Sequence, residues 1–320
     1  MKRLGSFTLT KKILPYLPQR LKDILYHRLL LSGSFPEIVH IENTNACNAK
    51  CIMCPREKMN RNIGVMDFPL FKKVVDECAA HPRLKELHLH GYGECLLEDG
   101  FDRKVKYAKE KGIKTIYIVT NGSLLNEEIC KNLISSGLDK MKISFYGATQ
   151  EIYEKVHVNL KFSVLEKNVL NLLKLREGMG SKNPSVFLQF LQMHENAQER
   201  DIFFKKWEKV IRSECGDALL EFELHNYGGG RKYKSLPSET GFKKGCSLPF
   251  AVMQILWNGE VAACCLDFNG RVILGSVKND SLFRIWNGNI FDRFRQAHRG
   301  LDFKEYPLCM QCDQIAASNQ

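Results

Sequence analysis

The chain has 320 residues, of which 44% are hydrophobic and 26% charged, and its formal net charge is +11. This balance excludes a disordered or fibrous protein and suits one large domain, or one large and one small domain. No apolar run is long enough to span a membrane, and the basic N-terminus lacks the apolar core and cleavage site of a secretory signal. We therefore expect a cytoplasmic protein without a membrane span. The positive charges are spread along the chain, which favours a solvated surface over attraction to an anionic ligand, and no nucleic-acid partner is expected.

Strand-like and helix-like segments alternate over the first two-thirds of the sequence, after an amphipathic helical lead-in at 9–33. The alternation indicates parallel βα units with right-handed crossovers. Six units are too few for a closed eight-stranded barrel. We therefore expect an α/β fold, a partial (β/α)6 TIM-like barrel whose chemistry lies at the carboxyl ends of the strands. The predicted strands are 37–43, 84–94, 115–122, 140–147, 185–193 and 219–225, and the predicted helices are 68–81, 101–111, 126–136, 149–157, 163–178 and 197–213.

The pattern changes in the glycine-rich stretch 226–241, which indicates a domain edge. Two β-like runs within 251–268 flank Asn258-Gly259, and this pair predicts a hairpin in which both turn residues have positive φ. A helical segment at 281–299 follows. We therefore expect three parts: a helical lead-in (1–36), the barrel (37–235), and a small auxiliary domain with a β-hairpin and a helix (236–320).

Twelve cysteines in a chain without a secretory signal suggest a reducing compartment, where thiolates more often serve metals or catalysis than disulfides. Cys47, Cys51 and Cys54 follow the first predicted strand at the spacing Cys-x3-Cys-x2-Cys. Three soft thiolates on one loop suit a [4Fe–4S] cluster with one iron left open. The alternative is a zinc site completed by a distant residue.

This cysteine loop, in its place after the first strand, resembles that of the radical S-adenosylmethionine (SAM) superfamily. The resemblance covers roughly residues 37–225. It implies that the open iron binds SAM and that an electron from the cluster cleaves SAM to a 5′-deoxyadenosyl radical. That radical abstracts a hydrogen atom from the substrate. A reductant such as flavodoxin or ferredoxin is the implied protein partner.

Other positions fit the same family. Gly93 and Glu94 match two residues of its Gly-Gly-Glu motif, which contacts the methionine amino group of SAM, while Tyr92 replaces the first glycine. A carboxylate accepts hydrogen bonds from an ammonium group, and glycine allows close approach of the backbone. The resemblance also implies that Asn121 and Ser144, at the ends of the third and fourth strands, lie beside SAM. Ordinary turn chemistry is the alternative for both.

Further residues near these motifs are candidates for the site. Met53 stands where the family usually has an aromatic residue near the adenine, and methionine can fill that place. Cys95 is a candidate hydrogen-atom donor, with core packing as the alternative. His88 and His90 share one face of the second strand with Tyr92, so these three are candidates for contacting substrate. Buried structural histidines are the alternative.

Four cysteines near the C-terminus form a second set that resembles the short "twitch" version of the SPASM auxiliary domain. The resemblance implies one auxiliary [4Fe–4S] cluster with four thiolate ligands, and a structural zinc site is the alternative. The spacing Gly-x4-Cys favours Cys264 over Cys265. Four ligands leave no open iron, so this cluster would carry electrons. The four residues are Cys246, Cys264, Cys309 and Cys312.

These features predict a radical SAM oxidoreductase with two [4Fe–4S] clusters and SAM. The layout resembles that of 2-deoxy-scyllo-inosamine dehydrogenase and, less closely, of anaerobic sulfatase-maturating enzymes. We favour a small sugar- or cyclitol-like alcohol as substrate, with the auxiliary cluster accepting an electron. The residues before the first strand are too few for a leader-binding domain, which weakly disfavours a peptide substrate. The alternatives are a peptide- or protein-modifying maturase, a redox-neutral epimerase, and a non-catalytic iron–sulfur or zinc protein that binds nucleic acid.

Overall fold

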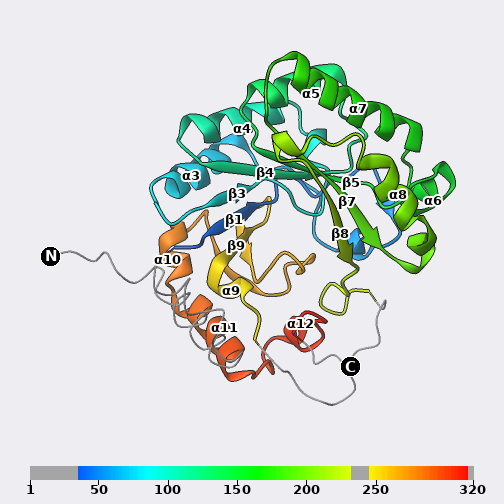
Figure 1. The fold of residues 1–320 in the computed structure, drawn as a ribbon. Helices are drawn as coiled ribbons and strands as arrows, with labels where there is room; N and C mark the ends of the chain where they lie inside the picture. The colour runs from blue at the N-terminus through cyan, green and yellow to red at the C-terminus, as the bar shows by residue number, and fades with distance from the viewer. Residues whose placement is uncertain (1–34, 232–244, 316–320) are drawn as a thin grey trace, which may run out of the picture.

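The computed structural model describes residues 35–231 and 245–315 (Figure 1). The lead-in expected at 9–33 lies outside these residues. Within them, no helix is both long and apolar enough to cross a membrane.

Nine strands form one sheet in the order β11-β10-β9-β1-β3-β4-β5-β7-β8. The pairs from β1 to β8 are all parallel, which confirms the predicted partial barrel of βα units. A separate two-stranded ladder joins β2 (Lys50–Cys51) to β6 (His157–Val158). The barrel strands are β1 (Ile38–Ile41), β3 (Glu86–His88), β4 (Thr115–Thr120), β5 (Lys140–Ser144), β7 (Ser185–Gln192) and β8 (Ala218–Glu223).

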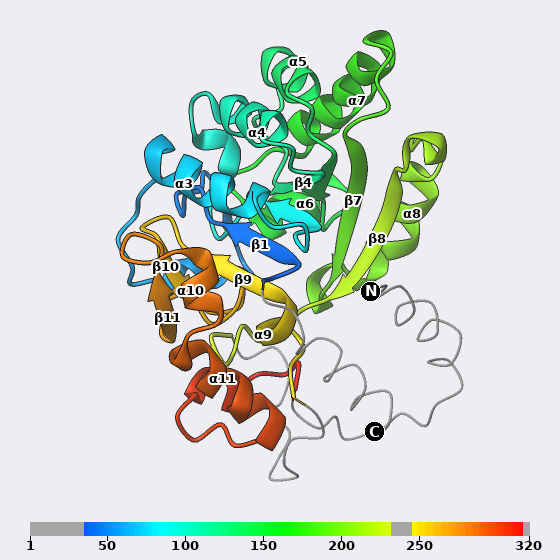
Figure 2. The same ribbon diagram turned by 90° about the vertical axis from the view of Figure 1, so that its left-hand side faces the viewer.

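Six α-helices cover the outer face of the barrel strands (Figures 1 and 2). The helix predicted at 197–213 is shorter than expected: its first residues belong to a 3-10 helix (His194–Glu199) and the α-helix ends at Trp207, while farther on Arg212 N donates to the Asp217 carboxylate (3.0 Å). The helices are α3 (Phe68–Ala79), α4 (Phe101–Glu110), α5 (Glu127–Ser135), α6 (Gln150–Val156), α7 (Phe162–Gly178) and α8 (Arg200–Trp207), and the short 3-10 helices are η2 (Pro55–Lys58), η3 (Cys95–Leu97), η4 (His194–Glu199) and η5 (Ser213–Cys215).

The auxiliary part of the chain continues the barrel sheet, because β9 pairs in parallel with β1 (Figure 2). The predicted hairpin forms between β9 and β10, but its turn is not the expected one. Gly259 has φ +87°, whereas Asn258 is not among the described residues with positive φ. The helix expected at 281–299 is two helices separated at Gly288, whose ψ of 159° is extended. The elements are α9 (Leu248–Ala251), β9 (Val252–Ile255), β10 (Glu260–Ala262), β11 (Ile273–Ser276), α10 (Leu282–Trp286), α11 (Asn289–Gly300) and α12 (Pro307–Met310).

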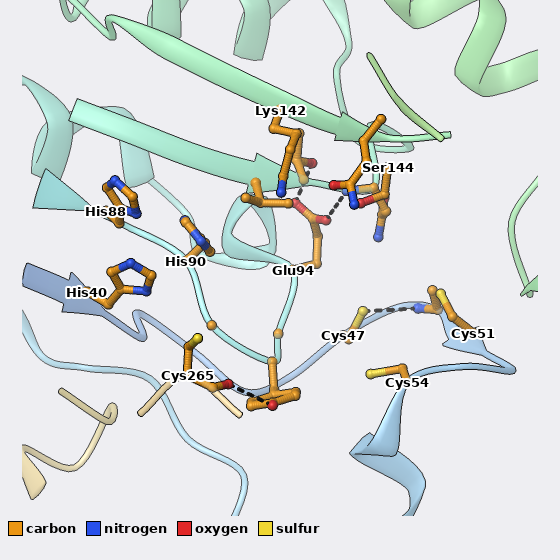
Figure 3. A pocket seen from close by; sticks show the side chains of 18 of the residues that line it. His40, Cys47, Cys51, Cys54, His88, His90, Glu94, Lys142, Ser144 and Cys265 are labelled. Atoms are coloured by element: carbon orange, nitrogen blue, oxygen red, sulfur yellow. Dashed lines mark hydrogen bonds between the residues drawn. The ribbon is translucent and has the colours of Figure 1, made fainter. Parts of the chain in front are cut away.

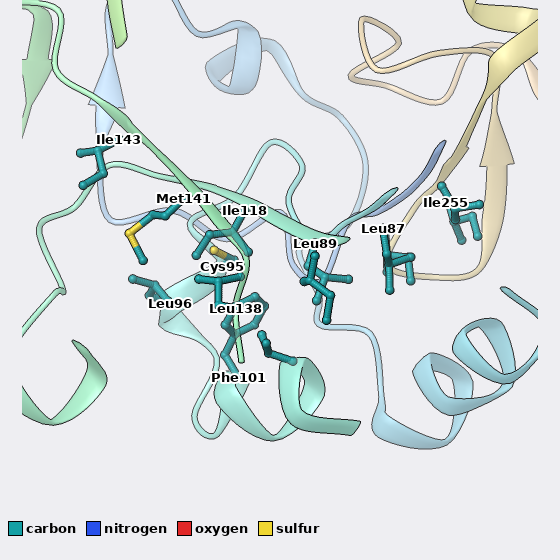
Figure 4. Packing of buried hydrophobic residues seen from close by; sticks show 14 of the residues in the cluster. Leu87, Leu89, Cys95, Leu96, Phe101, Ile118, Leu138, Met141, Ile143 and Ile255 are labelled. Carbon is teal, nitrogen blue, oxygen red and sulfur yellow. The ribbon is translucent and has the colours of Figure 1, made fainter. Parts of the chain in front are cut away.

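Alternation along each strand separates the core from the interior of the barrel. Leu87, Ile118 and Met141 point outward and pack beneath the helices in one continuous core (Figure 4). The intervening residues, such as His88 and Lys142, line an interior pocket. The two-residue period of the strands therefore places polar side chains inside the barrel while its outer layer stays apolar.

A buried ion pair connects the end of β1 to the auxiliary part of the chain. Arg61 donates from Nη1 and Nη2 to the two oxygens of Glu42, at 2.8 and 2.9 Å. The Glu42 side chain is only 1% exposed. Arg61 Nε also donates to the carbonyl of Phe268 (2.8 Å). One guanidinium therefore holds β1, the segment after the cysteine loop and the auxiliary domain together.

We predict that Arg61→Met lowers stability by about 3–5 kcal/mol, because it leaves the Glu42 carboxylate buried without its counter-charge. The measurement is the thermal unfolding midpoint of the reconstituted protein. Arg284→Met is the control, since the Arg284 side chain is 79% exposed. Equal midpoints for the two variants would contradict the prediction.

Candidate active site and auxiliary cysteine cavity

A cavity of about 500 Å³ opens at the carboxyl ends of the barrel strands. Its walls come from the cysteine loop after β1, from β3, β4, β5 and β7, and from the auxiliary domain. Figure 3 shows the three cysteines of the loop on one side, three histidines on the other, and Glu94 between them. The sheet order thus gathers side chains that lie far apart in the sequence.

Cys47, Cys51 and Cys54 all line this cavity, as their loop position predicted. The short β2–β6 ladder fixes the loop and brings Cys51 Sγ to 3.1 Å from His157 Nδ1. Arg56 Nη2 donates to the carbonyls of Cys47 (3.2 Å) and Ala49 (3.4 Å). Burial raises the pKa of all three thiols, and the charge of Arg56 opposes that rise. A bound metal centre would supply the positive charge that thiolates need here.

The spacing of the sulfur atoms distinguishes a cluster from a single ion. Thiolates bound to one tetrahedral zinc at about 2.3 Å lie less than about 4 Å apart. Within residues 35–231 and 245–315, no three cysteine sulfurs all come within 4.8 Å of one another. In a [4Fe–4S] cluster each thiolate binds a different iron. Both cysteine sets therefore fit a cluster better than a zinc ion.

Glu94 lies at the centre of the cavity and is only 2% exposed. Thr120 Oγ1 donates to its Oε1 (2.7 Å), and the Asn121 amide donates to its Oε2 (2.7 Å). Burial raises the pKa of Glu94, whereas these hydrogen bonds lower it. Leu96 N and the Cys95 thiol also donate to Oε1, so three donors contact Oε1 and one contacts Oε2. Oε2 can therefore still accept a hydrogen bond from a ligand.

Gly93 is needed for packing against the cysteine loop. A Cβ there would lie 2.3 Å from Thr44 O and 2.5 Å from Ala46 O. The Glu94 amide donates to the same Ala46 carbonyl (2.8 Å). The glycine of this motif therefore lets two loops of the site approach each other, and the backbone access to SAM expected from the sequence stays a prediction.

The remaining expected SAM contacts also line the cavity. Asn121 donates from Nδ2 to Asn48 Oδ1 (2.9 Å), which connects the third strand to the cysteine loop. Ser144 Oγ accepts from the Tyr146 hydroxyl (3.1 Å). Met53 is buried in a small apolar cluster beside Val156 and two of the cysteines. An apolar wall next to polar strand ends suits an adenosyl group.

Cys95 occupies a different environment from the other candidates. It is 2% exposed and belongs to the main core, with Leu96, Ile118 and Met141 nearby (Figure 4). Its thiol donates weakly toward Glu94 Oε1 (3.9 Å) and Val119 O (3.7 Å). It does not line the cavity among the described residues. The packing alternative, not hydrogen-atom donation, matches this position.

His88, His90 and Tyr92 do line the cavity, as the strand alternation predicted. Several other lining residues were missed. His40 and Lys142 occupy inward positions of β1 and β5. They alternate with the buried Val39 and Met141, and this pattern could have predicted that they face the interior. Their proximity depends on the order of strands in the sheet, which no local pattern reveals.

Lys142 is the basic residue among the described lining side chains, apart from the histidines. Burial lowers its pKa to about 8, and the charge of Cys265 opposes this slightly. Burial raises the pKa of Cys265 to about 11. The Tyr92 hydroxyl donates to the carbonyl of Cys265 (2.7 Å), so the auxiliary domain closes this side of the cavity.

A second, apolar cavity of about 30 Å³ lies inside the auxiliary part of the chain. Cys264 lines both this cavity and the large one, whereas Cys265 lines only the large one. Cys309 Sγ lies 3.6 Å from His298 Nε2. The structure thus brings together the four cysteines of the second set, Cys246, Cys264, Cys309 and Cys312.

Comparison with known families agrees with this geometry. Residues 41–203 match the model of the radical SAM superfamily. The chain belongs to the radical SAM superfamily. Residues 246–313 match SPASM, an iron–sulfur cluster-binding domain. Together they imply a SAM-binding [4Fe–4S] cluster and additional auxiliary cluster binding, which confirms the cofactors predicted from the sequence.

Two curated relatives and a crystal structure are similar to this radical SAM enzyme. A tungsten-containing aldehyde ferredoxin oxidoreductase cofactor-modifying protein of Pyrococcus furiosus is 29% identical over 313 residues, 86% of each chain. The SAM-dependent 2-deoxy-scyllo-inosamine dehydrogenase of Niallia circulans is 22% identical, over 88% of this chain and 95% of the relative. The crystal structure of BtrN with AdoMet and 2-DOIA shares the fold with a TM-score of 0.60 and 19% identity, over 87% and 93% of the two chains.

Peptide-binding proteins also share this fold. Streptococcus suis SuiB bound to its precursor peptide SuiA has a TM-score of 0.65 at 13% identity, over 97% of this chain and 75% of SuiB. Similarity at this level concerns the fold alone.

We predict that Glu94→Gln weakens SAM binding about 10- to 150-fold, because a charge-assisted hydrogen bond contributes roughly 1.5–3 kcal/mol. Equilibrium dialysis with the reconstituted protein measures the affinity. Glu199→Gln is the matched control, since Glu199 is also buried and accepts from backbone amides but does not line the cavity. Unchanged SAM affinity in Glu94→Gln would rule out this role.

Proposed function

We propose that this radical SAM enzyme oxidises a small polar alcohol, sugar- or cyclitol-like, and passes one electron to an auxiliary [4Fe–4S] cluster. The observation that carries the proposal is the shared wall between the two cavities. Cys264 lines both the large cavity beside Glu94 and the small cavity with the other three auxiliary cysteines. A substrate in the large cavity would therefore lie next to an electron acceptor.

Cys47, Cys51 and Cys54 would hold the catalytic cluster, and Glu94 would orient the SAM ammonium group. When bound, this cluster and SAM supply a 5′-deoxyadenosyl radical that removes a hydrogen atom from the substrate carbon. Met53 would pack near the adenine, with Asn121 and Ser144 at the polar end of the nucleoside. Met53, Glu94 and Asn121 are buried, which helps to exclude water and keeps a carbon radical from side reactions.

Lys142 is our proposed general base. The radical left on a carbinol carbon becomes strongly reducing when its hydroxyl loses a proton. A neutral amine in the same cavity can accept that proton, and a pKa near 8 makes the amine available near neutral pH. Cys246, Cys264, Cys309 and Cys312 would hold the auxiliary cluster, which would supply the acceptor for the one electron released as the ketone or aldehyde forms.

A second function is modification of a cofactor that belongs to another enzyme. It is favoured by the 29% identity to the cofactor-modifying protein of P. furiosus, which covers 86% of both chains. Such a substrate would use the same catalytic cluster and SAM site. The two proposals differ in the substrate and in whether the product is more oxidised.

We predict that replacing Cys47, Cys51 and Cys54 by alanine abolishes formation of 5′-deoxyadenosine from SAM and dithionite, yet leaves about four irons per chain on the auxiliary site. Replacing Cys309 and Cys312 by alanine should leave SAM cleavage intact but stop the oxidation of substrate. Iron analysis and chromatography of the nucleoside measure both. SAM cleavage by the triple variant would refute the assignment.

Isotope transfer tests the reaction type with a panel of cyclitols and sugars. Oxidation consumes one SAM per product and moves a substrate hydrogen into 5′-deoxyadenosine. A product of unchanged oxidation level that carries solvent deuterium at the reacting carbon would instead show epimerisation. Turnover only with a partner enzyme's cofactor would favour the second function.

We predict that product formation rises with pH through about 8, because the neutral form of Lys142 is the base and its pKa lies near that value. Lys142→Met should lose about 100-fold or more of product formation and the pH dependence, while 5′-deoxyadenosine release at pH 7 persists. Lys174→Met, at an exposed position of α7, is the control. A pH profile shared by Lys142→Met and the unchanged protein would exclude this base.

A further inference from the structure

Three histidines gather in the large cavity opposite the cysteine loop (Figure 3). His40, His88 and His90 each bring a ring nitrogen within 4.8 Å of the nitrogens of the other two. The ring centroids are 4.4 Å apart for His40–His88, 5.3 Å for His40–His90 and 5.5 Å for His88–His90. Among the described residues, these are the one group of three His, Cys, Asp or Glu side chains that converges so closely.

A second residue lies beside each ring. His88 Nε2 lies 2.8 Å from Glu86 Oε2, and because a carboxylate only accepts, this nitrogen carries the proton. His90 packs edge-on against the Tyr117 ring (centroids 5.5 Å apart), and Gln254 on β9 lies opposite His40 on β1. Such partners commonly orient metal-binding imidazoles, and a carboxylate–histidine pair is their best-known form.

The nitrogens that remain are buried and unsatisfied. Nδ1 of His88 and Nδ1 of His90 have no solvent contact and no hydrogen-bond partner. A buried polar atom without a partner is unfavourable, because it has lost its hydrogen bonds to water. Because His88 is already anchored through Nε2, its Nδ1 lone pair is free to bind a group that accepts electron pairs, and Nδ1 of His90 is unpaired beside it.

The electrostatics favour neutral rings. Burial is the main cause that lowers the pKa of all three histidines, to about 3 for His40. Neutral imidazole is the form that binds metal. The charged form of Lys142 would repel a cation bound here. Burial lowers the pKa of Lys142 to about 8, so its neutral form is populated at mildly alkaline pH. Glu86 supplies the nearest negative charge, shared with Lys140.

We propose that His40, His88 and His90 bind one divalent transition-metal ion, such as Zn²⁺ or Fe²⁺, with open coordination positions facing the large cavity. Imidazole ligands suit these ions, and three protein ligands with a free position are typical of catalytic sites. The ion would bind a substrate oxygen and fix the substrate between itself and Glu94. This site depends on neither the identity of the substrate nor the assignment of the two clusters.

Zinc binding to the cluster-loaded protein tests the proposal. The anaerobically reconstituted chain is treated with EDTA, titrated with ZnSO4, and analysed for zinc and iron by mass spectrometry. We expect one zinc per chain, with nitrogen and oxygen neighbours at about 2.0–2.1 Å and no sulfur in the zinc X-ray absorption spectrum. Absence of stoichiometric zinc, or a shell of sulfur atoms, would overturn the proposal.

Variants identify the ligands. The double variant His40→Gln/His90→Gln should lose the zinc and keep its iron, while His194→Gln, at an exposed position, should bind zinc normally. Glu86→Gln leaves the ligands in place but weakens the anchor of His88, so zinc affinity should fall about 10- to 100-fold. Retention of tight zinc binding by either the double variant or Glu86→Gln would contradict this site.

Discussion

Strand β1 is hydrogen-bonded on both edges, to β3 of the barrel and to β9 of the auxiliary domain. This double pairing joins the barrel, whose loop carries the first cysteine set, to the auxiliary domain, which carries the second set, through one sheet. Val39 and Ile41 anchor β1 in the core, and His40 between them faces the cavity. Beyond its end, the ion pair of Glu42 fixes the segment that carries the cysteine loop. Any displacement of β1 would therefore alter both cavities at once.

The large cavity places ionisable side chains in an environment with little water. Glu94 is buried and Lys142 is half-buried, and desolvation shifts the pKa of each toward its neutral form. Neither shift would occur at a solvated strand end. The closing contact between Tyr92 and the auxiliary domain helps to keep this environment, because it covers the open side of a barrel that has only six parallel strands. The missing part of the barrel wall is thus replaced by another domain.

Local patterns in the sequence predicted the strands, most helices, the cysteine loop and Glu94, because each depends on neighbouring residues or fixed spacing. His40 and Lys142 were not recognised, since their meeting depends on β1, β3, β4 and β5 lying in that order. The close contacts of Gly93 were not foreseen for a similar reason: they come from Thr44 and Ala46, some fifty residues earlier. The turn at Asn258 was also wrong, because a longer connection between β9 and β10 needs only one residue with positive φ.

The position of Cys264 on the wall between the two cavities has a mechanical consequence. If this thiolate holds the auxiliary cluster, as proposed, then the residue that borders both cavities is also a ligand of that cluster. Damage to that cluster by oxygen would then do more than remove an electron acceptor. It would also release the Cys264 side chain, so the wall between the two cavities would be held less firmly. The enzyme would then lose its electron acceptor and also restrain the substrate radical less well.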